Sequence, residues 1–97
     1  MPVYVSLMKL TEQGIKDIKN APARLEQAEK GLAAIGARLL AFYMVMGEYD
    51  YVSITEGPSD EAAMTFLIGL GMAGNVRTTT MKAFTREQVT EFVKNLP

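Results

Sequence analysis

The chain has 97 residues, of which 10 are Lys or Arg and 11 are Asp or Glu, and its formal net charge is −1. It contains no His, Cys or Trp, which excludes Cys/His zinc sites, iron–sulfur clusters, His-ligated haem, thiol nucleophiles and His-based catalytic triads. This length fits one domain over residues 1–97, with about 60–70% of the unfolded chain's surface buried on folding.

The charge pattern and the short apolar runs argue against two further classes, nucleic-acid-binding proteins and membrane proteins. Interspersed charges of both signs provide no basic stripe for a phosphate backbone, so nucleic-acid binding is not expected. Apolar runs end well before the roughly 20 residues that span a bilayer, and the N-terminus lacks a signal-peptide layout. We therefore expect a soluble cytoplasmic protein without a membrane segment, a metal site or a cofactor.

The first third of the chain predicts a strand followed by an interrupted helix. Residues 2–10 are β-branched and aromatic, as in a strand. One side of it carries Val3, Val5 and Leu7, and the other carries Tyr4, Ser6 and Met8. Residues 11–36 show helical spacing, and Pro22 predicts a break near Asn20, which could cap the second segment. Gly36 is expected to end the helix in the left-handed conformation.

The middle of the chain predicts a β-hairpin. Residues 37–46 are apolar on both sides of a strand, which is typical of a strand covered on both faces. Residues 47–49 form a turn, and residues 50–56 form the partner strand.

The last part predicts a helix, a strand and a short terminal helix. Ser59 is a natural cap for a helix whose apolar positions include Phe66 and Leu70, and residues 71–75 are expected to be a flexible exit. Residues 76–84 form a Thr-rich strand. Thr85 and Gln88 then match a capping box at the start of the terminal helix.

The element order β-α-β-β-α-β is the ferredoxin-like plan, an α+β fold with a four-stranded antiparallel sheet and both helices on one face. Tyr4, Tyr51, Ser53 and one side of the Thr-rich strand indicate a mixed surface on the opposite face. We expect two such sheets to pack face to face in a homodimer that forms a dimeric α/β barrel, or in a higher even-numbered homo-oligomer.

Two interpretations remain open for the segment from Gly47 to Asp50. In the structural one, Asp50 accepts hydrogen bonds from loop amides. In the functional one, Asp50 is a general base, Tyr49 or Tyr51 is its hydrogen-bond partner, and Arg24 or Arg77 clamps an anion.

The tyrosines raise the same choice between packing and binding. All four lie on predicted strands or the hairpin turn, where tyrosine commonly packs with its hydroxyl in water. Alternatively they line a cleft, to which Ser53 and Thr79 would add polar groups. The candidate ligand-binding residues are Tyr4, Arg24, Tyr43, Tyr51, Ser53, Arg77 and Thr79.

The glycine pattern Gly69-x-Gly71-x-x-Gly74 spells a dinucleotide-binding fingerprint. That fingerprint requires a strand before the glycines and a helix after them. Here a helix leads in and a strand leads out, so we interpret these glycines as a helix end.

The Gly47-x-Tyr49-Asp50 element resembles the one from which the GYD domain family takes its name. The resemblance extends to residues 11–14, 21–24 and 74–80, and so covers nearly the whole chain. It implies a small bacterial or archaeal protein of the dimeric α/β-barrel group, a family without an established biochemical function.

Two hypotheses about function follow. The first is a homo-oligomeric module that binds a small organic molecule. The alternative is a cofactor-independent oxygenase or isomerase, with Asp50 as base.

Overall fold

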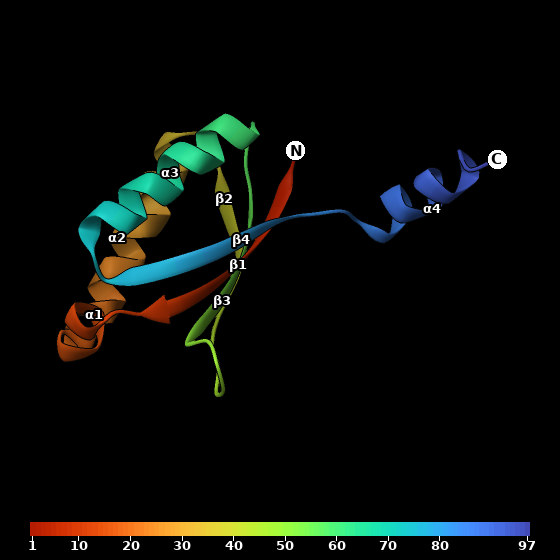
Figure 1. Cartoon of the computed structure of the whole chain (residues 1–97). Helices are drawn as coiled ribbons and strands as arrows, with labels where there is room; N and C mark the ends of the chain where they lie inside the picture. Colours follow the sequence, from red (N-terminus) through yellow and green to blue (C-terminus); the bar gives the residue numbers. More distant parts are fainter.

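The computed structural model describes residues 1–97, and its elements follow the predicted order (Figure 1). The elements are β1 (Val3–Leu10), α1 (Glu12–Lys16), η1 (Ile18–Asn20), α2 (Ala21–Ala34), β2 (Arg38–Met44), β3 (Tyr51–Glu56), α3 (Asp60–Ala73), β4 (Val76–Ala83) and α4 (Arg86–Lys94).

The four strands form one antiparallel sheet in the order β2-β3-β1-β4. β1 lies in the interior of the sheet, and its Ser6 is opposite Ser53 of β3 and Thr80 of β4. β2 and β3 form the predicted hairpin, with an irregular register between Leu39 and Ala41. This topology confirms the ferredoxin-like α+β fold with a C-terminal helix.

The predicted break in the first helical region is confirmed. The 3-10 segment η1 separates α1 from α2, and Pro22 lies in the first turn of α2, where its missing amide costs nothing. Asn20 occupies the N-cap position, but its side-chain amide donates to Asp17 Oδ1 at 2.6 Å instead of capping the helix. Gly36 has a φ of 76°, as predicted.

One local expectation is wrong. α3 continues through Gly71 to Ala73, and only Gly74 turns left-handed, so residues 71–73 are not a flexible exit. β2 is an edge strand, and a single chain does not cover both of its faces, since Tyr43 and Met44 are each 63% exposed.

The sheet faces are reversed relative to the prediction. Tyr4, Tyr51 and Ser53 do not lie on the open face: they are buried beneath α2 and α3, together with Ser6 and Met8. Polar groups can be buried this way when they are hydrogen-bonded, and Ser6 Oγ lies 2.7 Å from Thr80 Oγ1.

The open face of the sheet is therefore the more apolar one. Because side chains alternate along a strand and paired residues share a side, the register assigns the opposite residues to it. Its apolar members are Val3, Val5, Leu7, Ala41, Tyr43, Val52, Ile54, Met81 and Ala83. Lys9 and Arg77 lie at one end of this face, and the Arg38–Glu56 ion pair lies at the other.

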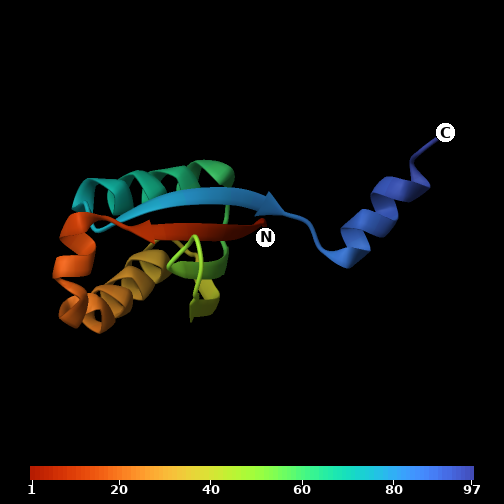
Figure 2. The same ribbon diagram turned by 60° about the horizontal axis from the view of Figure 1, so that its bottom comes forward.

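The body of the fold is a sheet with α2 and α3 on one side, and α4 stands apart from it at the end of β4 (Figures 1 and 2). None of the helices combines the length and the apolar character that a membrane span requires.

Candidate functional site

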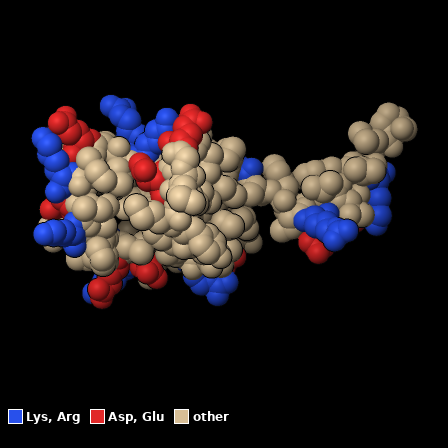
Figure 3. All heavy atoms as spheres, turned by 90° about the horizontal axis from the view of Figure 1, so that it is seen from below, with Lys and Arg blue, Asp and Glu red and all other residues tan.

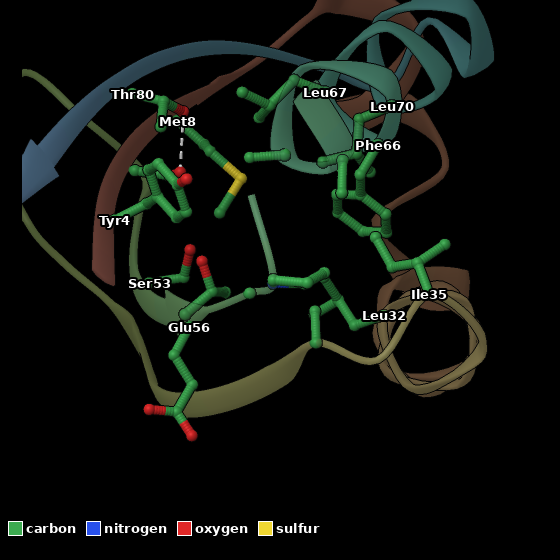
Figure 4. Close-up of a pocket in the computed structure, with 17 residues that line it drawn as sticks. Tyr4, Met8, Leu32, Ile35, Ser53, Glu56, Phe66, Leu67, Leu70 and Thr80 are labelled. Atoms are coloured by element: carbon green, nitrogen blue, oxygen red, sulfur yellow. Dashed lines mark hydrogen bonds between the residues drawn. The ribbon is translucent and has the colours of Figure 1, made fainter. Parts of the chain in front are cut away.

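A small cavity lies between the sheet and the two long helices. Its volume is about 50 Å³, which is room for a few water molecules but well below the roughly 300–1,000 Å³ of a typical ligand pocket. Figure 4 shows Tyr4, Met8 and Ser53 on the sheet side, facing Leu32 of α2 and Phe66 of α3. The wall is mainly apolar, with a few hydroxyl groups on the sheet.

The Tyr4 hydroxyl is hydrogen-bonded to the start of α3 at the cavity's margin. Tyr4 donates its hydroxyl to Asp60 Oδ1 at 2.5 Å, and Lys82 Nζ donates to Asp60 Oδ2 at 3.2 Å. Asp60 begins α3, so this chain of contacts connects β1 and β4 to the helix above them.

These contacts shift two pKa values in opposite directions. Burial is the main cause that raises the pKa of Tyr4 to about 12, and the hydrogen bond to Asp60 and the charges of Asp60 and Glu61 act in the same direction. The hydrogen bond from Tyr4 is the main cause that lowers the pKa of Asp60, followed by the one from Lys82, while burial opposes both. A neutral tyrosine and an ionised aspartate are thus the favoured pair.

We expect Asp60→Asn to lower the pKa of Tyr4 from about 12 toward its ordinary value of 10.0 without reaching it, because burial, the largest cause, remains. The ultraviolet absorbance of tyrosinate, recorded against pH, measures this, and Tyr4→Phe identifies the transition that belongs to Tyr4. An unchanged titration in Asp60→Asn would contradict the assignment.

The same shift predicts a loss of stability at high pH. The folded chain keeps the Tyr4 proton that the unfolded chain releases, so the contribution of Tyr4 to the free energy of unfolding is complete below pH 10 and is lost as the pH rises toward about 12. In Tyr4→Phe, denaturant unfolding should show a smaller decline over this range.

Asp50 lies outside the cavity and joins the ends of two strands. Its carboxylate accepts the amide hydrogen of Leu10 at 2.8 Å, and its own amide donates to Met8 O at 2.8 Å. Tyr49 lies beside it in the hairpin loop, with Lys9 Nζ 5.3 Å from the centre of the ring. This geometry matches the structural interpretation of Asp50; the catalytic role of Asp50 and Tyr49 stays a prediction.

We expect Asp50→Ala to lower the free energy of unfolding by about 1–3 kcal/mol, because the Leu10 amide loses its acceptor. Asp50→Asn should cost less, since its amide oxygen can accept the same hydrogen bond. Chemical denaturation of both variants measures the difference, and equal effects would argue against a structural hydrogen bond.

The other predicted site residues are distributed over three regions. Tyr4, Tyr51 and Ser53 are on the helix-covered side, and the Tyr51 ring lies 5.0 Å from that of Phe42. Tyr43, Arg77 and Thr79 are on the open side of the sheet. Arg24 lies near the α1–α2 junction, where its guanidinium pairs with Asp17 Oδ2 at 2.6 Å. The predicted residues therefore do not form one site.

The residues that sequence reasoning missed are Ser6, Thr80 and Asp60. Ser6 on β1 is directly opposite Thr80 on β4, and only the strand register shows that their hydroxyl groups meet. Asp60 fits the start of a helix, and nothing in its spacing indicates the contact with Tyr4. No group of three or more His, Cys, Asp or Glu side chains could hold a metal ion.

Comparison with solved structures supports the class of fold. The Mycobacterium tuberculosis leucine response regulatory protein LrpA matches with a TM-score of 0.64 at 24% identity, over 87% of this chain and 51% of LrpA. This chain thus spans about half of that regulator. FFRP-DM1 matches with a TM-score of 0.60 at 21% identity, over 87% of this chain and 100% of that protein. The shared feature is the ferredoxin-like domain.

Within that class, the chain belongs to the GYD domain family, which it matches over residues 4–93. It is also 30% identical over 84 residues to a Thermus thermophilus protein named glutamine synthetase and cystathionine beta-lyase binding protein. That match covers 86% of this chain and 88% of the relative. The resemblance noted from the sequence is thereby confirmed.

Proposed function

We propose that this GYD-domain chain is a homo-oligomeric binding module in which two copies pack through their open sheet faces. The observation that carries the proposal is the apolar centre of that face, which includes Val5, Ile54 and Met81 and which no part of the chain covers. Soluble monomers rarely expose a contiguous apolar patch above a few hundred Å².

The size and anatomy of the open face support this pairing. With eight residues in β1 and four strands in the sheet, the face measures roughly 26 Å by 19 Å, about 500 Å² in projection. This supplies a large share of the roughly 800 Å² of accessible surface per partner that stable interfaces bury, and contacts at the rim must supply the rest. Lys9 and Arg77 at one end and the Arg38–Glu56 pair at the other provide the polar rim that such interfaces have around an apolar centre.

We propose that the assembled module binds another protein, namely an enzyme of amino-acid metabolism. The name of the Thermus thermophilus relative supports this target, since it describes a binding protein for glutamine synthetase and cystathionine beta-lyase. The small volume of the cavity, about 50 Å³, favours a protein target over an enclosed metabolite.

Native mass spectrometry of the untagged protein, alone and mixed with glutamine synthetase or cystathionine beta-lyase from the same organism, tests the proposal. We expect an even number of subunits and a complex with at least one of the two enzymes, while an unrelated enzyme of similar size gives none. A bare monomer would contradict the sheet-face pairing. An oligomer that binds neither enzyme would agree with the sheet-face pairing but would contradict the proposed enzyme target.

A small organic ligand is a second candidate, favoured by the cavity itself. The cavity has the apolar walls and the few buried hydroxyl groups, those of Ser6 and Ser53, that are typical of a ligand-binding pocket. To admit a ligand of more than a few atoms, α2 and α3 would have to move apart. A reproducible non-covalent mass in the same spectrum that is lost in Ser53→Leu would support this ligand. A ligand mass unaffected by Ser53→Leu would place it elsewhere.

A further inference from the structure

α4 is an amphipathic helix without a partner in its own chain. Figures 1 and 2 show it beyond the end of β4, clear of the sheet and of the other helices. Its apolar stripe is half or more exposed and consists of Val89, Phe92, Val93 and Leu96. Figure 3 shows charged side chains gathered along one side of this segment and uncharged surface along the other.

Local interactions alone do not account for a stable helix here. α4 has nine residues and a complete capping box between Thr85 and Gln88, yet isolated helices shorter than about 12–15 residues are marginal in water. The aromatic contact of Phe92 is with Phe84 in the connecting segment, at 5.2 Å between ring centres. Most of the stability of α4 must therefore come from packing its stripe against another surface.

The outer side of α3 is a second apolar stripe without a partner. Met64, Ile68 and Met72 recur every four residues and are 54%, 58% and 82% exposed. Residues 62–73 carry no charge at all, whereas a helix that is apolar on every side is normally buried. The inner side of α3 covers the cavity, so the outer side still needs a cover.

Two glycines beside this stripe point to a close helix contact. Gly69 and Gly71 lie within α3, where each weakens the helix by roughly 1 kcal/mol relative to Ala. A Cβ at either position would meet nothing in this chain within 4 Å. No contact inside the chain requires them. They lie about 200° apart around the helix axis, so a helix from another copy could approach closely at one of them but not at both.

We propose that α4 is an assembly arm that packs its apolar stripe on the outer stripe of α3 in a second copy of this chain. The two stripes are of comparable length. Val89, Phe92 and Val93 on α4, with Leu96 just after its end, extend over about 10 Å, and Met64 to Met72 cover about 12 Å of helix axis. α3 of the same copy is out of reach, because only Phe84 and Thr85 lie between β4 and α4, which points away from the body.

The inference rests on the proposed sheet-face dimer and goes beyond it. When two sheets pack by their open faces, α2 and α3 lie on the outside of the dimer, so its two α3 stripes stay exposed. Each dimer then has two arms and two receiving surfaces. We place the receiving copy in another dimer, because the partner's α3 covers the far side of the partner's sheet. Arm and receptor are then different surfaces of different dimers, so the contact is heterologous and joins dimers into larger, even-numbered assemblies.

Engineered disulfides test the contact directly, because the chain has no cysteine of its own. A chain carrying Val93→Cys is mixed with one carrying Ile68→Cys, exchanged by mild denaturation and refolding, and oxidised. We expect a disulfide between the two chains, identified by mass after digestion. The matched control pairs Glu91→Cys, on the polar side of α4, with the same Ile68→Cys chain and should give little. Equal yields in both mixtures, or none with Val93→Cys, would overturn the proposal.

Native mass spectrometry distinguishes this inference from the proposed dimer. The full chain should contain four or more copies, and a chain that ends at Phe84 should contain two. Phe92→Glu should also reduce the assembly to dimers, while Thr90→Glu, outside the stripe, should not. A full chain that is only a dimer would overturn the arm contact and leave the sheet-face dimer standing. A truncated chain that still forms the full assembly would also overturn it.

Discussion

Gly14→Ala is expected to lower the free energy of unfolding by about 3 kcal/mol or more, because a Cβ there would make the shortest contact of any glycine position in this chain. A Cβ at residue 14 would lie 2.0 Å from the carbonyl oxygen of Asn75 and 2.9 Å from its carbonyl carbon. Neither atom can yield as a flexible side chain would, because both belong to the backbone. Overpacking a well-packed site typically costs about 1–3 kcal/mol, and backbone displacement adds to it.

The backbone at this junction is held by several hydrogen bonds. Thr11 donates its amide hydrogen to Asn75 O at 3.1 Å and its hydroxyl to Gly74 O at 2.6 Å, and it accepts the amide of Gly14 at 3.0 Å. Gln13 Nε2 donates to Ala73 O at 2.9 Å. Moving the start of β4 away from α1 to make room for a methyl group would stretch these bonds together.

The close contact with Asn75 and helix propensity predict changes in stability of opposite sign for Gly14→Ala, so the measurement distinguishes them. Helix propensity alone predicts that Ala in α1 stabilises the chain by about 1 kcal/mol. Gly31→Ala in α2 is the matched control, since its Cβ would meet Phe66 Cε1 at an ordinary 3.5 Å, and it should be neutral or stabilising. Urea denaturation of the three chains measures both changes. A stable Gly14→Ala protein would contradict the close contact with Asn75.

The succession of elements could be predicted because each rests on local patterns. The change from strand to helix spacing after Leu10, the proline at residue 22 and the capping box at Thr85 all act within a few residues. The end of α3 is harder to predict because glycines at 71 and 74 look alike in sequence, while only Gly74 takes a positive φ.

The use of the two sheet faces could not be derived from composition. One side of β1 has the composition of a core, with Val3, Val5 and Leu7. The other side, with Tyr4, Ser6 and Met8, has the composition of a surface. The second side is nevertheless the buried one, because Ser6 is hydrogen-bonded to Thr80 and Tyr4 to Asp60 at the start of α3. An apolar pattern indicates that a surface is covered without indicating whether the same chain covers it.

The candidate site was predictable only in part, for a similar reason. Tyr4, Tyr51 and Ser53 share one side of adjacent strands, which alternation along a strand makes foreseeable. Arg24 is a plausible anion clamp in the sequence, but the break before α2 places its guanidinium against Asp17. Such positions depend on how helices bend and pack, which a single sequence does not specify.

In the chain that ends at Phe84, which lacks the α4 arm, Val5→Lys is expected to convert the proposed dimer into monomers while leaving the fold of each chain intact. Val5 is paired with Ile54 on β3 and with Met81 on β4, near the middle of the open face. In a single chain its side chain is partly exposed, so an ammonium group there stays in water. The secondary structure seen by circular dichroism should therefore be unchanged.

In the dimer the same substitution is far more costly. A two-fold interface repeats every residue, so two lysines would enter one apolar contact, and burying an unpaired charge costs several kcal/mol per ion. At about 1.4 kcal/mol per tenfold change, the dissociation constant should rise by at least roughly 10³-fold. Analytical ultracentrifugation over a range of concentrations measures it, with Gln27→Lys, exposed on α2, as the charge-matched control. A truncated Val5→Lys chain that sediments as the truncated chain with Val5 does would contradict a subunit interface on the sheet.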